Sequence, residues 1–112
     1  MVEAKPWGAY SVLTKGTGFQ VKRVEVNAGK RLSLQKHAQR TEDWTIVAGS
    51  GVVTLGDKEI AVRRSSFVHV PIGELHRIHN TGHELLIFIE VQFGEYLGED
   101  DIVRVQDDFN RP

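Results

Sequence analysis

The stretch that decides the fold is residues 29–49, GKRLSLQKHAQRTEDWTIVAG, in which an amide, an imidazole and a carboxylate fall within eight positions. Gln35 and His37 are two residues apart, so both side chains point to the same side of an extended strand. Glu42 follows a short polar connection and can face them from the next strand. His76, which follows a turn containing proline and glycine, supplies a fourth donor. These donors suit a divalent metal ion, which we expect at the mouth of a small β-barrel.

Short runs rich in β-branched and aromatic residues, separated by glycine- and proline-containing turns, recur along the chain. Their alternation predicts about nine strands, over residues 9–13, 19–26, 32–37, 42–48, 52–55, 60–62, 67–70, 76–80 and 85–93. No helical periodicity of any length is present, so the sequence predicts an all-β sandwich or barrel. Between Val21 and Val24 the apolar positions change parity, which predicts a β-bulge in that strand.

Length and composition narrow the class of protein. The 112 residues are enough for one domain, and we find no repeat or linker that would divide residues 1–112. The absence of cysteine excludes disulfides and thiolate metal sites. A net charge of -1 offers no field for nucleic acid or for an acidic membrane. The chain has no secretory signal and no apolar run long enough to span a membrane, so we expect a cytoplasmic protein.

The last segment, residues 93–112, differs in character from the rest. It is acidic, yet it carries two arginines, Arg104 and Arg111. We expect this segment to dock at the mouth of the barrel, where its arginines would face the metal and its acidic residues would face solvent.

Two motifs resemble those of the cupin family. Residues 29–49 resemble the first cupin motif. Their pattern is Gly29-x5-Gln35-x-His37-x4-Glu42-x6-Gly49, with glutamine in place of the motif's first histidine. The second resembles Ser65-x5-Pro71-x-Gly73-x2-His76-x3-Asn80, which has serine in place of the leading glycine. The short segment between the two motifs suits a compact single cupin.

More narrowly, almost the whole chain is similar to the cupin domain of type II mannose-6-phosphate isomerases. That domain also occurs at the C-terminal end of bifunctional mannose-1-phosphate guanylyltransferases. The similarity includes LSLQKHAQRTEDW at residues 32–44, EVQ at residues 90–92 and GEYLGEDDIVR at residues 94–104. The resemblance implies a double-stranded β-helix, or jelly-roll barrel, that interconverts mannose 6-phosphate and fructose 6-phosphate. It also implies one divalent metal ion (Zn, Co, Mn, Ni or Fe), a phosphorylated sugar as the substrate and a homodimer.

The resemblance assigns roles to individual residues. It implies that the metal ligands are Gln35, His37, Glu42 and His76. It implies a catalytic role for Arg40 and Glu42, and substrate contacts from Arg40, Arg104 and Arg111. The guanidinium group of arginine suits bidentate contact with phosphate oxygens, and Arg40 is tethered near the site because it lies between two ligands in sequence.

The base that moves a proton between C1 and C2 of the sugar is not identified by the sequence. Lys22, His69 and His79 are candidates, although each histidine more readily fits an outward-facing strand position. The 112 residues contain no nucleotidyltransferase domain, so we do not expect guanylyl transfer from them.

The sequence departs from the family pattern at Ala38, Gln39 and Asp43, where the family usually has histidine. We expect these changes to remove polar groups from the inner wall of the barrel. They leave open a second hypothesis, in which the domain is a non-catalytic cupin that binds a sugar phosphate or has a regulatory role.

A third hypothesis is an Fe(II) oxygenase. His37, His76 and Glu42 form a set of two histidines and one carboxylate, which such oxygenases use. Gln35 as a fourth donor and the arginines of the chain argue against this class.

Overall fold

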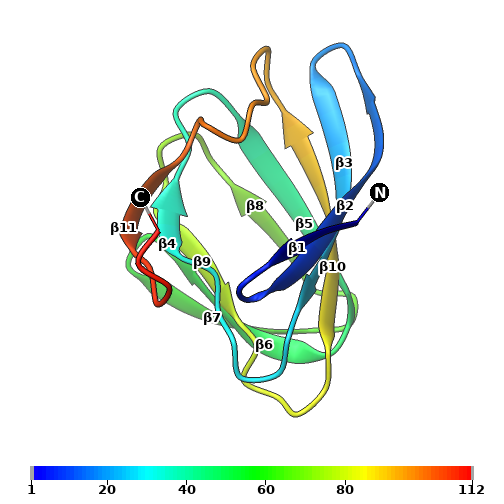
Figure 1. The fold of residues 1–112 in the computed structure, drawn as a ribbon, viewed down its shortest axis with the longest axis vertical. Coiled ribbons are helices and arrows are strands. Elements are labelled where there is room, and N and C mark those ends of the chain that lie inside the picture. Colours follow the sequence, from blue (N-terminus) through cyan, green and yellow to red (C-terminus); the bar gives the residue numbers. More distant parts are fainter. Residues whose placement is uncertain (1, 112) are drawn as a thin grey trace.

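The computed structural model describes residues 2–111, which form eleven strands and no helix. The strands are β1 (Val2–Lys5), β2 (Gly8–Gly16), β3 (Phe19–Val26), β4 (Leu34–Lys36), β5 (Thr41–Ala48), β6 (Ser50–Leu55), β7 (Lys58–Arg63), β8 (Phe67–Val70), β9 (His76–His79), β10 (Leu86–Phe93) and β11 (Val103–Gln106). They form two antiparallel sheets that face each other (Figure 1). Among residues 2–111 there is no helix that could cross a lipid bilayer.

Each sheet is assembled from strands that are distant in sequence. The first sheet has the order β1-β2-β3-β10-β5-β8, and the second has the order β11-β4-β9-β6-β7. From β3 onward the chain therefore passes repeatedly from one sheet to the other, which is the arrangement of a jelly-roll barrel. The prediction of an all-β barrel is confirmed.

The apolar core fills the space between the two sheets. The first sheet contributes Trp44, Phe88 and Leu86, and the second contributes Val53 and Ile78, all of them fully buried. The rings of Trp44 and Phe88 pack with their centroids 4.8 Å apart. Burial of side chains of this size contributes about 1.5–3 kcal/mol each, so this core is the main source of stability.

The inward face of the first sheet changes from apolar to polar along its strands. In one row Val24 of β3 pairs with Phe88 of β10, and Phe88 pairs with Ile46 of β5. In the next rows the buried residues are mostly polar, and they include Lys22, Glu90, Gln92 and Glu42. The core therefore ends in a polar floor, and this floor is the base of the candidate site.

The bulge predicted within residues 19–26 is absent. β3 pairs with β10 without interruption from Phe19 to Val26, and the register shift lies instead in β2, between Val12 and Thr14. The apparent change of parity arises because Lys22, a charged residue, occupies an inward position on β3.

Strands β1 and β11 are not among the nine predicted strands. Most of their residues are exposed, so neither strand has a buried face to give its sequence an apolar alternation. They lie at the edges of the two sheets, held by backbone pairing and by side-chain bonds such as those of Tyr10 to Glu3 and of Arg77 to Gln106.

Candidate metal centre

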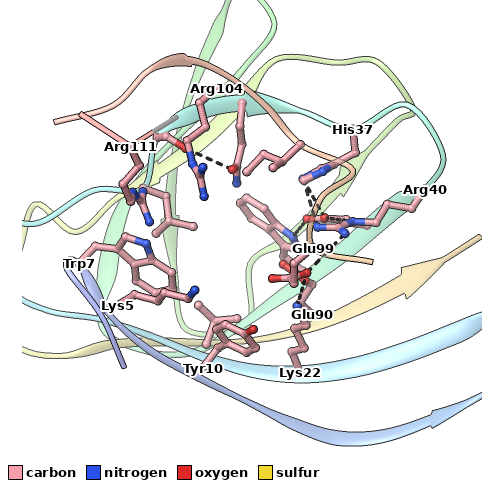
Figure 2. Close-up of a pocket in the computed structure, with 17 residues that line it drawn as sticks. Lys5, Trp7, Tyr10, Lys22, His37, Arg40, Glu90, Glu99, Arg104 and Arg111 are labelled. Atoms are coloured by element: carbon pink, nitrogen blue, oxygen red, sulfur yellow. Dashed lines mark hydrogen bonds and ion pairs between the residues drawn. The ribbon is translucent and has the colours of Figure 1, made fainter. Parts of the chain in front are cut away.

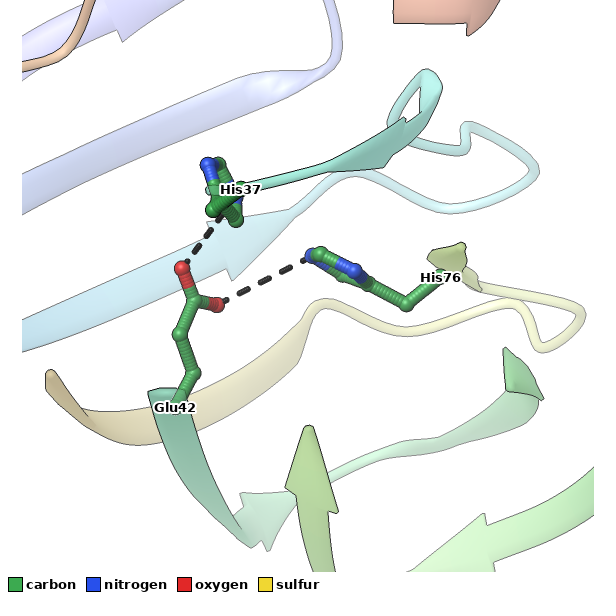
Figure 3. A group of neighbouring side chains, drawn as sticks. All are labelled: His37, Glu42 and His76. Carbon is green, nitrogen blue, oxygen red and sulfur yellow. Dashed lines mark ion pairs between the residues drawn. The ribbon is translucent and has the colours of Figure 1, made fainter. Parts of the chain in front are cut away.

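Side chains from three segments converge at the polar end of the core. His37 follows β4 directly, Glu42 belongs to β5 and His76 begins β9. One donor atom from each of the three lies within 4.8 Å of the donor atoms of the others. His37 Nε2 lies 3.2 Å from Glu42 Oε2, and His76 Nε2 lies 3.9 Å from Glu42 Oε1. Figure 3 shows the two imidazoles directed toward different oxygens of the same carboxylate.

Each histidine is oriented by a hydrogen bond from its other ring nitrogen. Nδ1 of His76 bonds to the backbone oxygen of Glu74 at 2.9 Å, and Nδ1 of His37 bonds to the backbone oxygen of Asp101. A carbonyl oxygen only accepts, so each Nδ1 carries a proton and Nε2 is the nitrogen left to bind a metal ion. Burial lowers the pKa of His76, against the opposite effect of Glu42, and keeps that ring neutral. Imidazoles oriented in this way are suited to binding a metal ion.

Glu42 is fixed at both carboxylate oxygens. Arg40 Nε donates to Oε2 at 2.8 Å, and Trp44 Nε1 donates to Oε1 at 3.0 Å. Burial acts to raise the pKa of Glu42, but Arg40, His76 and His37 together outweigh it and the pKa is lowered to about 2. The carboxylate is therefore ionised and has one orientation, as a metal ligand requires.

Gln35 is brought to the same place by strand pairing. It lies opposite His76 across β4 and β9, and it lines the cavity that His37 and Glu42 also line. Its amide oxygen accepts a hydrogen bond from Ser33 Oγ at 3.2 Å, which fixes the direction of the amide.

The donors present fit a divalent transition-metal ion. His76 Nε2 is buried and has no hydrogen-bond partner within residues 2–111. An unsatisfied buried polar atom costs about 1–3 kcal/mol, so this lone pair needs a partner such as a metal ion. Two imidazoles, one carboxylate and one amide oxygen suit Zn, Co, Mn, Ni or Fe better than Ca or Mg. The residues that would hold the ion are Gln35, His37, Glu42 and His76.

A cavity (Figure 2) is lined by three of these residues, Gln35, His37 and Glu42, whereas His76 does not line it. Among residues 2–111 it is lined by five cationic side chains, those of Lys5, Lys22, Arg40, Arg104 and Arg111. In Figure 2, Lys5 and Arg111 lie across the cavity from His37 and Arg40. The cavity therefore joins a metal-donor end to a cationic end, and this arrangement suits an anionic ligand with oxygen atoms at both ends.

Arg40 lies at the metal-donor end. It is buried, and besides its bond to Glu42 its Nη2 lies 3.3 Å from Nε2 of His37. Burial acts to lower the pKa of Arg40, but the neighbouring carboxylates of Glu42, Glu90 and Glu99 raise it. Arg40 is therefore a permanent cation that contacts two of the predicted metal ligands.

Arg104 and Arg111 reach the cavity from the C-terminal segment. Arg104 is on β11, opposite Gln35 of β4, and it lines the cavity wall. Arg111 is held by Asp107, which accepts hydrogen bonds from its Nε at 2.8 Å and from its backbone N–H at 2.9 Å. Both arginines therefore reach the cavity from the segment that follows Phe93.

The three positions where the family has histidine lie outside the inner wall, contrary to our expectation. Ala38 and Gln39 are exposed, and their backbone N–H groups donate to the carboxylate of Asp101 at 3.0 and 2.9 Å. Asp43 is absent from the cavity lining and pairs with the exposed His69, whose Nδ1 lies 2.5 Å from Asp43 Oδ1. The inner wall therefore keeps its polar groups despite these substitutions.

Of the three candidates for the base, one lines the cavity. Lys22 does so, whereas His69 is exposed and His79 lines a separate surface groove. A buried carboxyl that sequence analysis does not single out, Glu90, also lines the cavity. A signal for it is present in the sequence, because Glu90 has the same parity as Phe88 on a strand whose even-numbered residues are buried.

Comparison with known proteins identifies relatives over nearly the whole chain. Residues 2–107 match the family model described as mannose-6-phosphate isomerase C-terminal. The chain is 47% identical over 107 residues to the xanthan biosynthesis protein XanB of Xanthomonas campestris pv. campestris, covering 96% of this chain and 23% of that protein. It is 43% identical over 104 residues to a mannose-1-phosphate guanylyltransferase of Sinorhizobium fredii, covering 93% of this chain and 20% of that protein. The chain thus spans between a fifth and a quarter of these curated relatives.

Solved structures agree with the fold. The crystal structure of Rru_A2000 from Rhodospirillum rubrum, a cupin-2 domain, matches with a TM-score of 0.71 and 25% sequence identity. The match covers 83% of this chain and 67% of that one. The chain therefore has the cupin fold that its two motifs predict.

Proposed function

The chain belongs to the family of mannose-6-phosphate isomerase C-terminal domains, and on that premise we propose that it interconverts mannose 6-phosphate and fructose 6-phosphate with a divalent metal ion. The observation that carries the proposal is that one cavity is lined by both metal donors and a set of cationic side chains. Isomerisation of a sugar phosphate needs both features, an electrophile near C1 and C2 and an anion site for the phosphate at the other end of the molecule.

A bound divalent ion supplies electrophilic polarisation of the C1 and C2 oxygens of the open-chain sugar. Glu42 is the one anion among the four residues that would hold the ion, so the centre keeps about one unit of positive charge. The phosphate is bound across the cavity by cationic groups, namely Lys5, Arg104 and Arg111. Guanidinium groups suit this task because they bind phosphate oxygens in pairs.

Arg40 contributes by holding the carboxylate ligand. Its Nε is bonded to Glu42 Oε2 and its Nη2 faces His37, so two of its three nitrogens are directed at residues that would hold the metal. Its Nη1 has no hydrogen-bond partner within residues 2–111 and lies 3.6 Å from Glu99 Oε2. This placement supports a catalytic contribution through the metal centre, and it leaves phosphate binding to the arginines of the C-terminal segment.

The proposal is tested by supplying the purified protein with Zn²⁺, Co²⁺, Mn²⁺, Ni²⁺ or Fe²⁺ in turn and measuring fructose 6-phosphate formed from mannose 6-phosphate. We expect turnover with at least one ion, and its loss on adding a chelator. Glu42→Gln removes the charged ligand and should abolish turnover. Glu25→Gln, in a partly exposed Arg23–Glu25 pair outside the cavity, is the matched control and should be active. No turnover with any ion would overturn the proposal.

A second candidate function is non-catalytic binding of a sugar phosphate in the service of another domain or protein. The observation that favours it is the departure from the family pattern at Ala38, Gln39 and Asp43, where the family usually has histidine. Titration calorimetry with mannose 6-phosphate separates the two candidates. Binding without conversion under any metal condition supports the second, whereas conversion excludes it.

A further inference from the structure

Glu90 is a buried carboxyl group that belongs to the cavity but not to the metal-donor set. It lies on β10 in the middle of the first sheet, opposite Lys22 of β3 and Trp44 of β5. Its side chain lines the cavity although only 7% of the residue is exposed. Placing a carboxyl group in such a position carries a desolvation penalty, which a single hydrogen bond offsets only in part. A group retained at that cost is a candidate for chemistry.

The position of Glu90 relative to the metal centre follows from strand register. Glu42 pairs with Gln92 and Trp44 pairs with Glu90, so Glu42 and Glu90 are diagonal neighbours on one face of the sheet. Diagonal neighbours of this kind have their side chains about 7–8 Å apart at the backbone end. Glu90 is thus next to the donor set without belonging to it, and both Glu90 and Glu42 line the same cavity.

One oxygen of Glu90 is held and the other faces the cavity. Gln92 Nε2 donates to Oε2 at 2.5 Å, and Gln92 is itself fixed because its Oε1 accepts from Gln20 Nε2 at 3.1 Å. Within residues 2–111 no hydrogen bond to Oε1 is present, yet Oε1 is not fully buried. Oε1 is therefore the oxygen available to a substrate.

The other titratable groups of the cavity are committed elsewhere. Lys22 Nζ donates to Glu99 at 2.9 Å and lies 4.3 Å from the centre of the Tyr10 ring. Glu42 is bonded at both oxygens by Arg40 and Trp44. Glu99 also lines the cavity, but its side chain is 52% exposed and is paired with Lys22 and Arg40. Glu90 is instead a buried carboxyl with a fixed position and one oxygen free of hydrogen bonds within residues 2–111.

We propose that Glu90 carries the proton between C2 and C1 of the open-chain sugar phosphate, an inference that rests on the proposed function. The Glu90 carboxylate takes the proton from C2, the electrons of that C–H bond form the C1–C2 double bond, and the carbonyl electron pair moves onto O1. In the resulting cis-enediolate the proton of the C2 hydroxyl passes to O1. The Glu90 carboxyl then returns its proton to C1, and C2 becomes the ketone carbon. Every atom and electron is conserved, so no oxidant or reductant is required.

The acidity of Glu90 matches this task. Burial, with a further contribution from the negative charge of Glu42, raises the pKa of Glu90 to about 8, against the opposing effect of Lys22 and Arg40. A proton carrier works best when its pKa is near the working pH, because it must both take and release the proton.

The test follows exchange of the C2 proton of mannose 6-phosphate with deuterated water by NMR, using the metal-loaded protein. Glu90→Gln keeps the shape of the side chain and an oxygen that can accept from Gln92, but it cannot carry a proton. We expect exchange to slow roughly 100-fold or more, the usual contribution of a positioned base. Metal content and mannose 6-phosphate affinity by calorimetry should stay within about threefold, since Glu90 is assigned no role in either. Glu25→Gln is the control for the same chemical change outside the cavity and should exchange at the unsubstituted rate.

The outcomes are distinct. Exchange by Glu90→Gln at the rate of the unsubstituted protein overturns this inference and leaves the proposed function standing. An unsubstituted protein that shows neither exchange nor conversion overturns the proposed function and this inference with it. If Glu90→Gln loses its metal, Glu90→Asp decides, because it keeps a carboxyl group and draws it back from the cavity. Slow exchange with metal retained supports the inference, and loss of metal in both variants overturns it in favour of a structural role.

Discussion

Ser65 carries a local strain that its sequence position explains. Its φ of 74° lies in the left-handed region, where a side chain costs about 1–2 kcal/mol relative to glycine. This is the position at which the second cupin motif has glycine, so the chain keeps the backbone conformation after losing the residue that suits it. We expect Ser65→Gly to raise the free energy of unfolding by about 1 kcal/mol, the strain less the added freedom of glycine in the unfolded chain. Thermal unfolding should show a Tm several degrees higher.

The converse substitution is the control for this prediction. Gly73 has a φ of 78°, and a Cβ added there would meet no atom within 4 Å. Gly73→Ala should therefore lower the free energy of unfolding by about 1 kcal/mol through backbone strain alone. An unchanged or lower Tm for Ser65→Gly, with Gly73→Ala behaving as expected, would show that Ser65 is not strained.

Glu90 should make the stability of the metal-free protein fall as pH rises. Burial and the charge of Glu42 raise its pKa from 4.5 to about 8 in the folded state. Between pH 4.5 and about 8 the folded protein therefore keeps a proton on Glu90 that the unfolded chain has already released. The contribution of Glu90 to the free energy of unfolding is therefore full below pH 4.5. It falls progressively up to about pH 8, by at most about 1.4 kcal/mol per pH unit.

Urea unfolding of the metal-free protein at several pH values measures this dependence. Glu90→Gln removes the titrating group, so its free energy of unfolding should decline less between pH 5 and 8 than that of the unsubstituted protein. Parallel pH profiles for the two proteins would contradict the assigned pKa.

At the scale of elements, the segment between β10 and β11 fixes the loop that begins at His37, a candidate metal ligand. The carboxylate of Asp101 accepts hydrogen bonds from the backbone N–H groups of Ala38 and Gln39, and its backbone oxygen bonds to His37 Nδ1. One residue of the C-terminal segment therefore sets both the path of the loop and the direction of the imidazole. Partners that orient metal ligands in this way influence metal affinity about 10–100-fold when removed.

Asp101→Ala keeps the backbone oxygen that bonds to His37 and removes only the carboxylate that holds the loop. We therefore expect it to lower the free energy of unfolding by about 1–3 kcal/mol, because two N–H donors lose a charged acceptor, and to weaken metal binding through the displaced loop. Metal Kd by calorimetry and denaturant unfolding measure the two effects. Asp100→Ala is the neighbouring control, since the Asp100 side chain bonds to the hydroxyl of Tyr96 near the surface and touches no ligand. Equal effects of the two substitutions would mean that the contact to the loop is unimportant.

The elements also show which parts of the site can be inferred from sequence. Gln35 and His37 share a side because they are two apart on a strand, and Glu42 follows from the next strand, so local spacing predicts their convergence. The contact of Asp101 with Ala38 joins residues 63 positions apart, and no local pattern encodes it. Strand pairing between β3, β10 and β5 likewise determines that Lys22 and Glu90 face the cavity.

The strand pattern is predictable wherever a strand has one buried and one exposed face. β10 is the clearest case, with buried residues at every even position from Leu86 to Gln92. β1 and β11 lack a buried face and escape prediction for that reason. On β3 a buried face is present but one of its inward positions holds a charged residue. Lys22 breaks the apolar alternation where the core gives way to the candidate site, and this break led to the wrong prediction of a bulge.

At the scale of the whole molecule, the candidate metal donors come from both sheets. Gln35 and His76 belong to the second sheet, and Glu42 belongs to the first. Between them the apolar core gives way to polar side chains, so packing contributes less at this end of the barrel than at the other. An ion bound by these residues would link the sheets where apolar contacts are fewest.

Metal binding should therefore stabilise the entire fold, because the donor set exists only when both sheets are assembled. At a free metal concentration 100 times the Kd the gain is about 2.7 kcal/mol, which corresponds to a rise in Tm of roughly 10 °C for a chain of this size. Thermal unfolding of chelator-treated protein with added Zn²⁺, Co²⁺ or Mn²⁺ measures it. Glu42→Gln should lose most of the rise, and Ca²⁺ should give little, since two of the four donors are imidazoles. A rise of equal size in Glu42→Gln would place the metal elsewhere, and no rise with any transition-metal ion would contradict a centre that joins the sheets.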